Sequence, residues 1–188
     1  MTKIIDLSNV SDPNKEVEIK NASIKDMQCS YGYELLTGKT KGDTLNRGGV
    51  HVIHDDLQES FNQLTIFIAH VDGAFSSWAN NQTPLAELEE KEEVEKYSIS
   101  GFRISGAEEN RSVIISGSKE TPYGTMAVTT PKLKMNGNYL YLDELEVRLV
   151  AAISEVEEYM DGKTAPQFEQ EEIEFVEADS DDFENNKV

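Results

Sequence analysis

Residues 97–135, "YSISGFRISGAEENRSVIISGSKETPYGTMAVTTPKLKM", contain three β-strand patterns in succession. The segments 97–105, 111–119 and 124–135 are rich in β-branched and apolar residues, which favour strands. Turn residues separate them, with Gly106 and Asn110 in the first connection and Thr121–Pro122 in the second. Short strands joined by short turns indicate an antiparallel meander.

A second strand region precedes it. Residues 16–37 alternate in part between apolar and polar side chains, which predicts strands with one buried face. Residues 37–49 contain four glycines and predict a turn-rich loop, and residues 50–53 predict one short strand. The alternate positions of its second half hold apolar and aromatic side chains, which are expected on one face of a strand: Cys29, Tyr31, Tyr33 and Leu35.

Helical spacing of apolar residues appears in three places. Residues 54–71 predict a helix in which Asp55 or Asp56 favours the N-terminus. Residues 83–97 open with Thr83 as the expected N-cap and continue as a short, very acidic surface helix. Residues 143–163 give the clearest pattern, which begins at a capping Asp143 and ends at Gly162.

The order of these elements predicts an α+β fold: a small antiparallel sheet or barrel with two or three helices packed on one side. We expect a single domain over residues 1–164. Residues 165–188 carry nine acidic residues and one lysine without apolar periodicity, which predicts a disordered acidic tail.

Composition limits the functional classes. The chain has 188 residues, a single cysteine and a formal net charge of −19. One cysteine allows no internal disulfide, the first residues do not form a signal-peptide pattern, and no apolar run is long enough to span a membrane. We therefore expect a cytoplasmic protein that does not contact membranes.

The acidity is unevenly distributed along the chain. Residues 55–96 contain ten acidic and two basic residues, whereas residues 97–135 contain five basic and three acidic residues. Net charge alone predicts repulsion from nucleic acid. The locally basic strand regions are the exception, so we look for a nucleic-acid-binding surface among their residues.

No catalytic or metal-binding pattern is present. "GKTKGD" at 38–43 contains Gly-Lys-Thr but has Tyr33 where a phosphate-binding loop needs glycine. His54 and His70 are about 24 Å apart along one straight helix, so they cannot share a metal ion there. Cys29 is expected to be a small core residue. We expect neither enzyme activity nor a cofactor.

The basic residues of the strand regions lie among aromatic residues. A basic groove with aromatic side chains for base stacking is typical of proteins that bind single-stranded nucleic acid. The candidate binding residues are Lys39, Lys41, Arg47, Arg103, Lys132, Lys134, Tyr31, Tyr33, Phe102 and Tyr123. Solvent-exposed lysines and strand-forming aromatics of an ordinary sheet would give the same pattern.

The tail adds a second indication. Its last ten residues, "DSDDFENNKV", place Phe183 directly after Asp181 and Asp182, and "EEIEFVE" before them contains Phe175. With the locally basic strands, this layout resembles the small single-stranded-DNA-binding proteins of bacteria and their viruses. The body, through "HDDLQESFNQL" and "TTPKLK", also resembles uncharacterised phage and prophage proteins.

The resemblance to single-stranded-DNA-binding proteins implies an OB-like barrel, single-stranded DNA as a partner and a role in phage DNA replication. It also implies that Phe175, Asp181, Asp182 and Phe183 recruit replication or repair proteins. In the family the aromatic residue stands at or next to the terminus, whereas five residues follow Phe183 here. A homodimer is left open.

Two other functions fit the sequence. An acidic nucleic-acid mimic, which would inhibit a host defence or DNA-processing enzyme, requires one continuous acidic face. A structural or adaptor protein of a virus particle is the other alternative. Single-strand binding instead requires Lys39, Lys41, Lys132 and Lys134 to converge on one concave face.

Overall fold

The computed structural model describes residues 16–75, 83–107 and 110–166. Its sheet follows the strand order β3-β2-β1-β4-β5-β6, with all neighbours antiparallel, and a short β7 extends the β6 side by pairing with β5. The strands are β1 (Val17–Lys25), β2 (Gln28–Leu35), β3 (Thr44–Val52), β4 (Tyr97–Ser105), β5 (Ser112–Thr121), β6 (Gly124–Thr129) and β7 (Leu133–Lys134).

The α+β class and the antiparallel sheet are confirmed, and the barrel alternative is wrong. β3 and β6 lie at opposite ends of the strand order and do not pair with each other, so the sheet is open. The expected strand 124–135 is divided into β6 and β7, because Pro131, which has no N–H to donate, interrupts the pairing after Thr130.

β3 is longer than the sequence indicated. Residues 44–49 belong to this strand although they were expected in a loop. Gly49 is required within the strand, because a methyl group at this position would overlap the hydroxyl of Tyr159 and the carbonyl of Cys29. The Tyr159 hydroxyl donates a hydrogen bond to the His51 carbonyl at 2.8 Å, which attaches the last helix to this strand.

Five helices accompany the sheet among the described residues: α1 (Asp55–Asn62), α2 (Thr65–Val71), α3 (Leu85–Glu89), α4 (Glu92–Glu95) and α5 (Leu142–Met160). The single helix expected over 54–71 is interrupted after Asn62. Arg148 satisfies the Gln63 carbonyl at the break with a 2.9 Å hydrogen bond. His54 is the N-cap of α1, and Asp55 and Asp56 occupy its first turn.

Two expected helix starts also shift. Pro84 is the N-cap of α3, so Thr83 lies one residue outside the cap. Tyr141 is the N-cap of α5 and makes no side-chain capping bond, while Asp143 lies in the first turn. An aspartate in the first turn still interacts favourably with the helix dipole.

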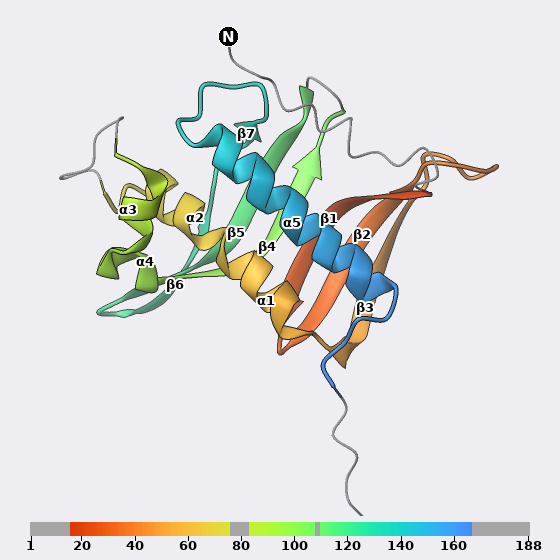
Figure 1. Cartoon of the computed structure of the whole chain (residues 1–188), viewed down its shortest axis with the longest axis horizontal. Helices are drawn as coiled ribbons and strands as arrows, with labels where there is room; N and C mark the ends of the chain where they lie inside the picture. Colours follow the sequence, from red (N-terminus) through yellow and green to blue (C-terminus); the bar gives the residue numbers. More distant parts are fainter. Residues whose placement is uncertain (1–15, 76–82, 108–109, 167–188) are drawn as a thin grey trace, which may run out of the picture.

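The helices cover one face of the sheet. Figure 1 shows α5 crossing the strands diagonally, with α1 and α2 beside it. The core lies between this helix layer and the sheet. It contains Leu57, Phe61, Leu145, Leu149 and Val156 from the helices, against Ile19, Phe102, Val113 and Ile115 from the strands.

Candidate nucleic-acid interface

The second face of the sheet, which we call the open face, carries small polar residues. In antiparallel pairs, directly opposite side chains share a face. The register therefore places one row of six residues across the six long strands: Gly48, Ser30, Ser23, Gly101, Ser116 and Thr129. The next row contains Asn46, Gly32, Asn21, Arg103 and Ile114.

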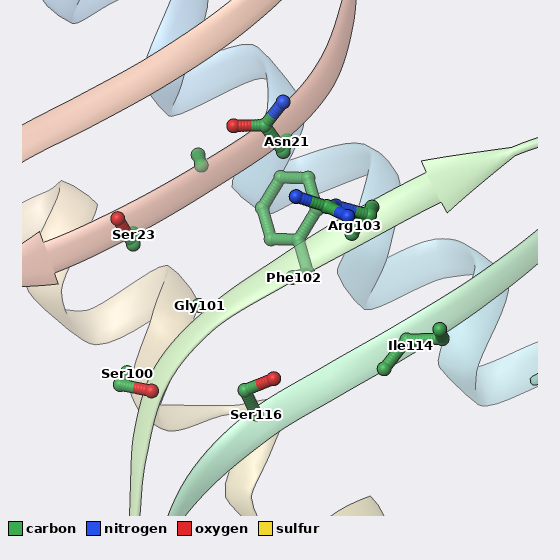
Figure 2. Close-up of a pocket in the computed structure, with 9 residues that line it drawn as sticks. Asn21, Ser23, Ser100, Gly101, Phe102, Arg103, Ile114 and Ser116 are labelled. Atoms are coloured by element: carbon green, nitrogen blue, oxygen red, sulfur yellow. The ribbon is translucent and has the colours of Figure 1, made fainter. Parts of the chain in front are cut away.

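A shallow depression of about 300 Å³ lies in this face over β1, β4 and β5. Figure 2 shows Asn21, Ser23, Ser100, Arg103 and Ser116 around it, with the helices behind the strands. The pairing of β1 shifts between Ile19 and Asn21, and that of β4 shifts between Ile99 and Gly101. Such bulges bend strands, and Gly101 contributes no side chain, so the sheet is hollowed at this point.

Five of the nine residues that line the depression carry side-chain hydrogen-bond donors. Arg103 is exposed, and its guanidinium makes no hydrogen bond or ion pair within the described parts of the chain. Three hydroxyls and the Asn21 amide surround the same space. Arginine presents a planar set of N–H donors that matches the oxygens of phosphate or carboxylate. The depression is therefore suited to an anionic oxygen group.

Other basic residues of the open face differ in how they are paired. Glu18 accepts from Lys20 at 2.8 Å and from Arg111 at 3.0 Å, and Lys20 also lies 3.1 Å from Glu34. Lys25 and Lys134 are exposed, and no ion pair joins either of them to another described residue.

Lys25, Arg103 and Lys134 therefore remain available for an external anion. The register places Lys134 beside Ser112 on the open face. From strand spacings of about 4.8 Å and residue rises of about 3.4 Å, Arg103 lies roughly 14 Å from Lys25 and roughly 12 Å from Lys134, measured between Cα positions. The three residues form a diagonal track across the open face.

The charges of the molecule are separated between its two layers. The five helices contain fourteen aspartates and glutamates and a single base, Arg148, whereas the strands contain six bases and three acids. Long-range repulsion of a polyanion therefore originates mainly from the helix side. The open face is the part of the described structure where that repulsion is weakest.

The predicted lysines do not converge on one groove. Lys39 and Lys41 lie in the loop between β2 and β3, and Lys132 and Lys134 lie in or beside β7, at the same end of the sheet. Four strand spacings separate β2 from β7, about 19 Å. Arg47 pairs with Tyr31 and is directed to the helix side of the edge strand β3. Only Arg103 and Lys134 of the predicted basic residues lie on the diagonal track.

The prediction that aromatic rings stack on bases is wrong for three of the four residues, because their rings are buried. Tyr31, Tyr33 and Phe102 are at most 8 % exposed because they face the helices. Tyr31 packs edge-on against Tyr159 with ring centroids 6.2 Å apart, and Phe102 packs against Phe61 at 5.6 Å. Tyr123 is fully exposed, but it lies in the turn between β5 and β6, away from the depression.

The sequence interpretation missed Lys25 and the polar residues of the depression. A signal was present, because six serines recur in two neighbouring strands: Ser98, Ser100, Ser105, Ser112, Ser116 and Ser118. The tail residues Phe175, Asp181, Asp182 and Phe183 lie outside the described residues.

The histidines and the cysteine have structural contacts. His54 accepts a hydrogen bond from the Asp56 backbone at 3.2 Å, and His70 Nδ1 lies 3.1 Å from the Tyr139 hydroxyl. Cys29 is fully buried, and burial raises the pKa of its thiol to about 12. Within the described ranges, no group of three or more histidine, cysteine or acidic side chains could hold a metal ion.

No protein-family model, curated protein or solved structure matches this chain. Among the described helices, none is long and apolar enough to cross a membrane.

Proposed function

We propose that this protein binds single-stranded nucleic acid along the open face of its sheet. The observation that carries the proposal is the unpaired Arg103 guanidinium in a depression of hydroxyl and amide groups, on the face opposite the acidic helices. Phosphate contacts supply most of the affinity of non-specific nucleic-acid binding. Lys25 and Lys134 extend the same track on either side.

The composition of the open face determines the mode of binding. No aromatic side chain lines the depression except Phe102, whose ring is buried on the other side of the sheet. Base stacking, which gives about 1–3 kcal/mol per base in other single-strand binders, is therefore weak here. We expect modest affinity, little sequence preference and a strong dependence on salt.

A single strand suits this face better than a duplex. A duplex carries one negative charge per roughly 1.7 Å of its axis and is stiff, so it cannot follow a bent and shallow track. A single strand has a lower charge density and can bend between the three basic residues. Because its charge density is lower, the net charge of −19 repels it less than it repels a duplex.

The test is a fluorescence-anisotropy titration with labelled oligo-dT at low and moderate salt. Arg103→Glu should weaken binding by at least about tenfold, because a hydrogen bond to a charged group contributes about 1.5–3 kcal/mol. Arg47→Glu is the matched control, because it makes the same charge change on the helix side of an exposed strand. We expect it to change affinity by less than about threefold.

Equal losses in the two variants would show that net charge, rather than the open face, governs binding. Undetectable binding of the unmodified protein at 10 mM salt would contradict the proposal altogether. Thermal denaturation of both variants verifies that either substitution leaves the domain folded.

The helix layer supports a second candidate function, an acidic nucleic-acid mimic. The five helices contain fourteen acidic residues and only one basic residue, Arg148. Helices α1 and α5, which carry nine of these acidic residues, pack side by side. A mimic should inhibit cleavage of labelled duplex DNA by a nuclease with a basic cleft. Neutralising two exposed residues, Asp143→Asn with Glu144→Gln, should weaken that inhibition. Absence of inhibition at low salt would eliminate this candidate.

A further inference from the structure

The two edge strands of the sheet differ in how they are protected. At the end of β3, the Val52 carbonyl accepts a 3.0 Å hydrogen bond from Ala165, and Ile53 forms a bridge with Thr164. β6 is the last strand of the order on the other side, and no described segment pairs with its outer edge (Figure 1). It contains no charged residue and no proline, which are the usual means of blocking such an edge.

The pairing of β6 with β5 determines which backbone groups point outward. Thr130 donates to the Ile115 carbonyl at 2.9 Å, so Thr130–Ile115 is a hydrogen-bonded pair. Hydrogen-bonded and non-bonded pairs alternate along an antiparallel ladder. Val128 and Met126 therefore bond inward, and the N–H and C=O groups of Thr125, Ala127 and Thr129 point away from the sheet.

The sequence of this edge is nearly symmetric, Thr-Met-Ala-Val-Thr over 125–129. We propose that β6 pairs antiparallel with β6 of a second copy of this chain, about a twofold axis at Ala127. Ala127 then faces Ala127 of the second copy, and Thr125 faces Thr129 of the second copy. The outward groups of these three positions form about six backbone hydrogen bonds, two for each bonded pair.

Side chains support the same register. Met126 is 50 % exposed on the helix side of the sheet, and in this pairing it lies opposite Val128 of the second copy. Apolar and β-branched side chains in directly opposite positions stabilise sheets. Two residues before Thr125, in the turn that precedes β6, the fully exposed Tyr123 comes level with Pro131 of the second copy.

The chemistry of the edge fits a second copy better than a charged peptide. The strand has no charge that would attract one, whereas it is complementary to itself in hydrogen bonding and in side-chain size. One strand pair buries little area, so the dimer is weak. The two chains each carry −19, so screening their repulsion with salt should strengthen the dimer.

The dimer would extend the open face. A twofold axis perpendicular to the sheet places both open faces on one side. The two Arg103 residues are then about 24 Å apart across the strands and about 27 Å apart along them, so roughly 36 Å apart in all. A single strand could then contact both tracks. This consequence rests on the proposed function, whereas the dimer itself does not, and the two respond to salt in opposite directions.

Disulfide cross-linking tests the pairing and its register. Hydrogen-bonded antiparallel partners have Cα atoms about 5.5 Å apart, within the range that a disulfide spans. Ala127→Cys should therefore form a covalent dimer on oxidation. Thr125→Cys is the matched control, equally exposed on the same strand, because its two copies would lie about 14 Å apart. Cys29 is buried and contributes little background.

We expect at least about tenfold more covalent dimer from Ala127→Cys than from Thr125→Cys, at high protein concentration and 0.5 M salt. Equal yields, or no cross-linking of Ala127→Cys, would overturn the proposed register. Val50→Cys on the exposed β3 edge should give no more covalent dimer than Thr125→Cys. A higher yield from Val50→Cys would show that the chains pair through β3 and not through β6.

Sedimentation velocity provides an independent measurement on the unmodified chain. The dimer fraction at about 100 µM protein should rise between 0.05 and 0.5 M salt, as the Debye length falls. Ala127→Pro removes only an outward N–H and should give a folded monomer under the same conditions. A wild-type chain that stays monomeric at 0.5 M salt would refute the dimer.

Discussion

Truncation of Phe102 distinguishes a core residue from a nucleic-acid contact. The ring is 3 % exposed and packs against Phe61, with ring centroids 5.6 Å apart and planes tilted by 43°. Replacing a buried phenylalanine by alanine costs about 3–5 kcal/mol through lost burial and the cavity that remains. For a domain of this size, each kcal/mol lowers the melting temperature by roughly 2–4 °C.

Phe102→Ala should therefore lower the melting temperature by roughly 6–20 °C. Below the transition, affinity for oligo-dT should be unchanged, because the ring faces the helices. Phe102→Leu should give a smaller decrease, since most of the volume is kept. Circular dichroism measures the transition, and anisotropy at 10 °C measures the affinity of the folded variant.

Tyr123→Ala is the matched control, because Tyr123 is an aromatic of the same sequence pattern that is fully exposed. Its melting temperature should stay within about 2 °C of wild type, since surface substitutions rarely exceed about 0.5 kcal/mol. A Phe102→Ala variant with a wild-type melting temperature and weakened oligo-dT binding would refute the placement of this ring in the core.

Three further outcomes are expected. Charge reversal of Lys132 and Lys134 should weaken oligo-dT binding and reduce its salt slope by about 0.7 per lost phosphate contact; an unchanged slope would remove β7 from the track. Residues 167–188 carry nine acids and one lysine, so we expect them to compete with oligo-dT for the basic residues of the open face. Their deletion should tighten oligo-dT binding most at low salt, and unchanged anisotropy there would refute this competition. The Asp72 carboxylate lies 2.6 Å from the Lys119 ammonium and accepts a hydrogen bond from Tyr97, and these contacts lower the pKa of Asp72 below its ordinary value. The ionised carboxylate therefore stabilises the fold above pH about 4, and this stabilisation is lost as the pH falls further. Asp72→Asn should thus lower the free energy of unfolding at pH 7 by at most about 1 kcal/mol, and urea denaturation should show a smaller difference at pH 3.

The sequence predicted which residues share a face of a strand, but not which face is covered. Tyr31 and Tyr33 lie on the same side of β2, as their spacing indicated. Their side is buried because α5 packs across it, and Tyr159 of that helix contacts Tyr31. Which face a helix covers depends on chain topology, and alternation within one strand carries no information about it.

The turn between β1 and β2 was not predicted, for a different reason. Its two turn residues, Asp26 and Met27, both have positive φ, 51° and 59°. Such turns usually contain asparagine or glycine, so methionine gives no turn signal. Residues 44–49 of β3 were missed because their glycines suggest a loop, whereas Gly49 is needed for the close approach of Tyr159.

The candidate site could be predicted only in part. Arg103 and Lys134 were identified from local charge, and their shared face follows from the pairing of β5 with β4 and β7. Lys25 joins them through the pairing of β1 with β4, which joins strands far apart in the sequence. No spacing in the sequence determines such a pairing.

An NMR titration of the isotope-labelled protein with unlabelled oligo-dT at low salt tests the open-face assignment most directly. The backbone amide signals of Ser23, Gly101 and Ser116 should shift progressively, because these residues line the depression. Signals of Glu155 and Glu158 on α5 should stay in place. Shifts confined to α1 and α5, or no shifts at 10 mM salt, would contradict binding of single-stranded nucleic acid on the open face.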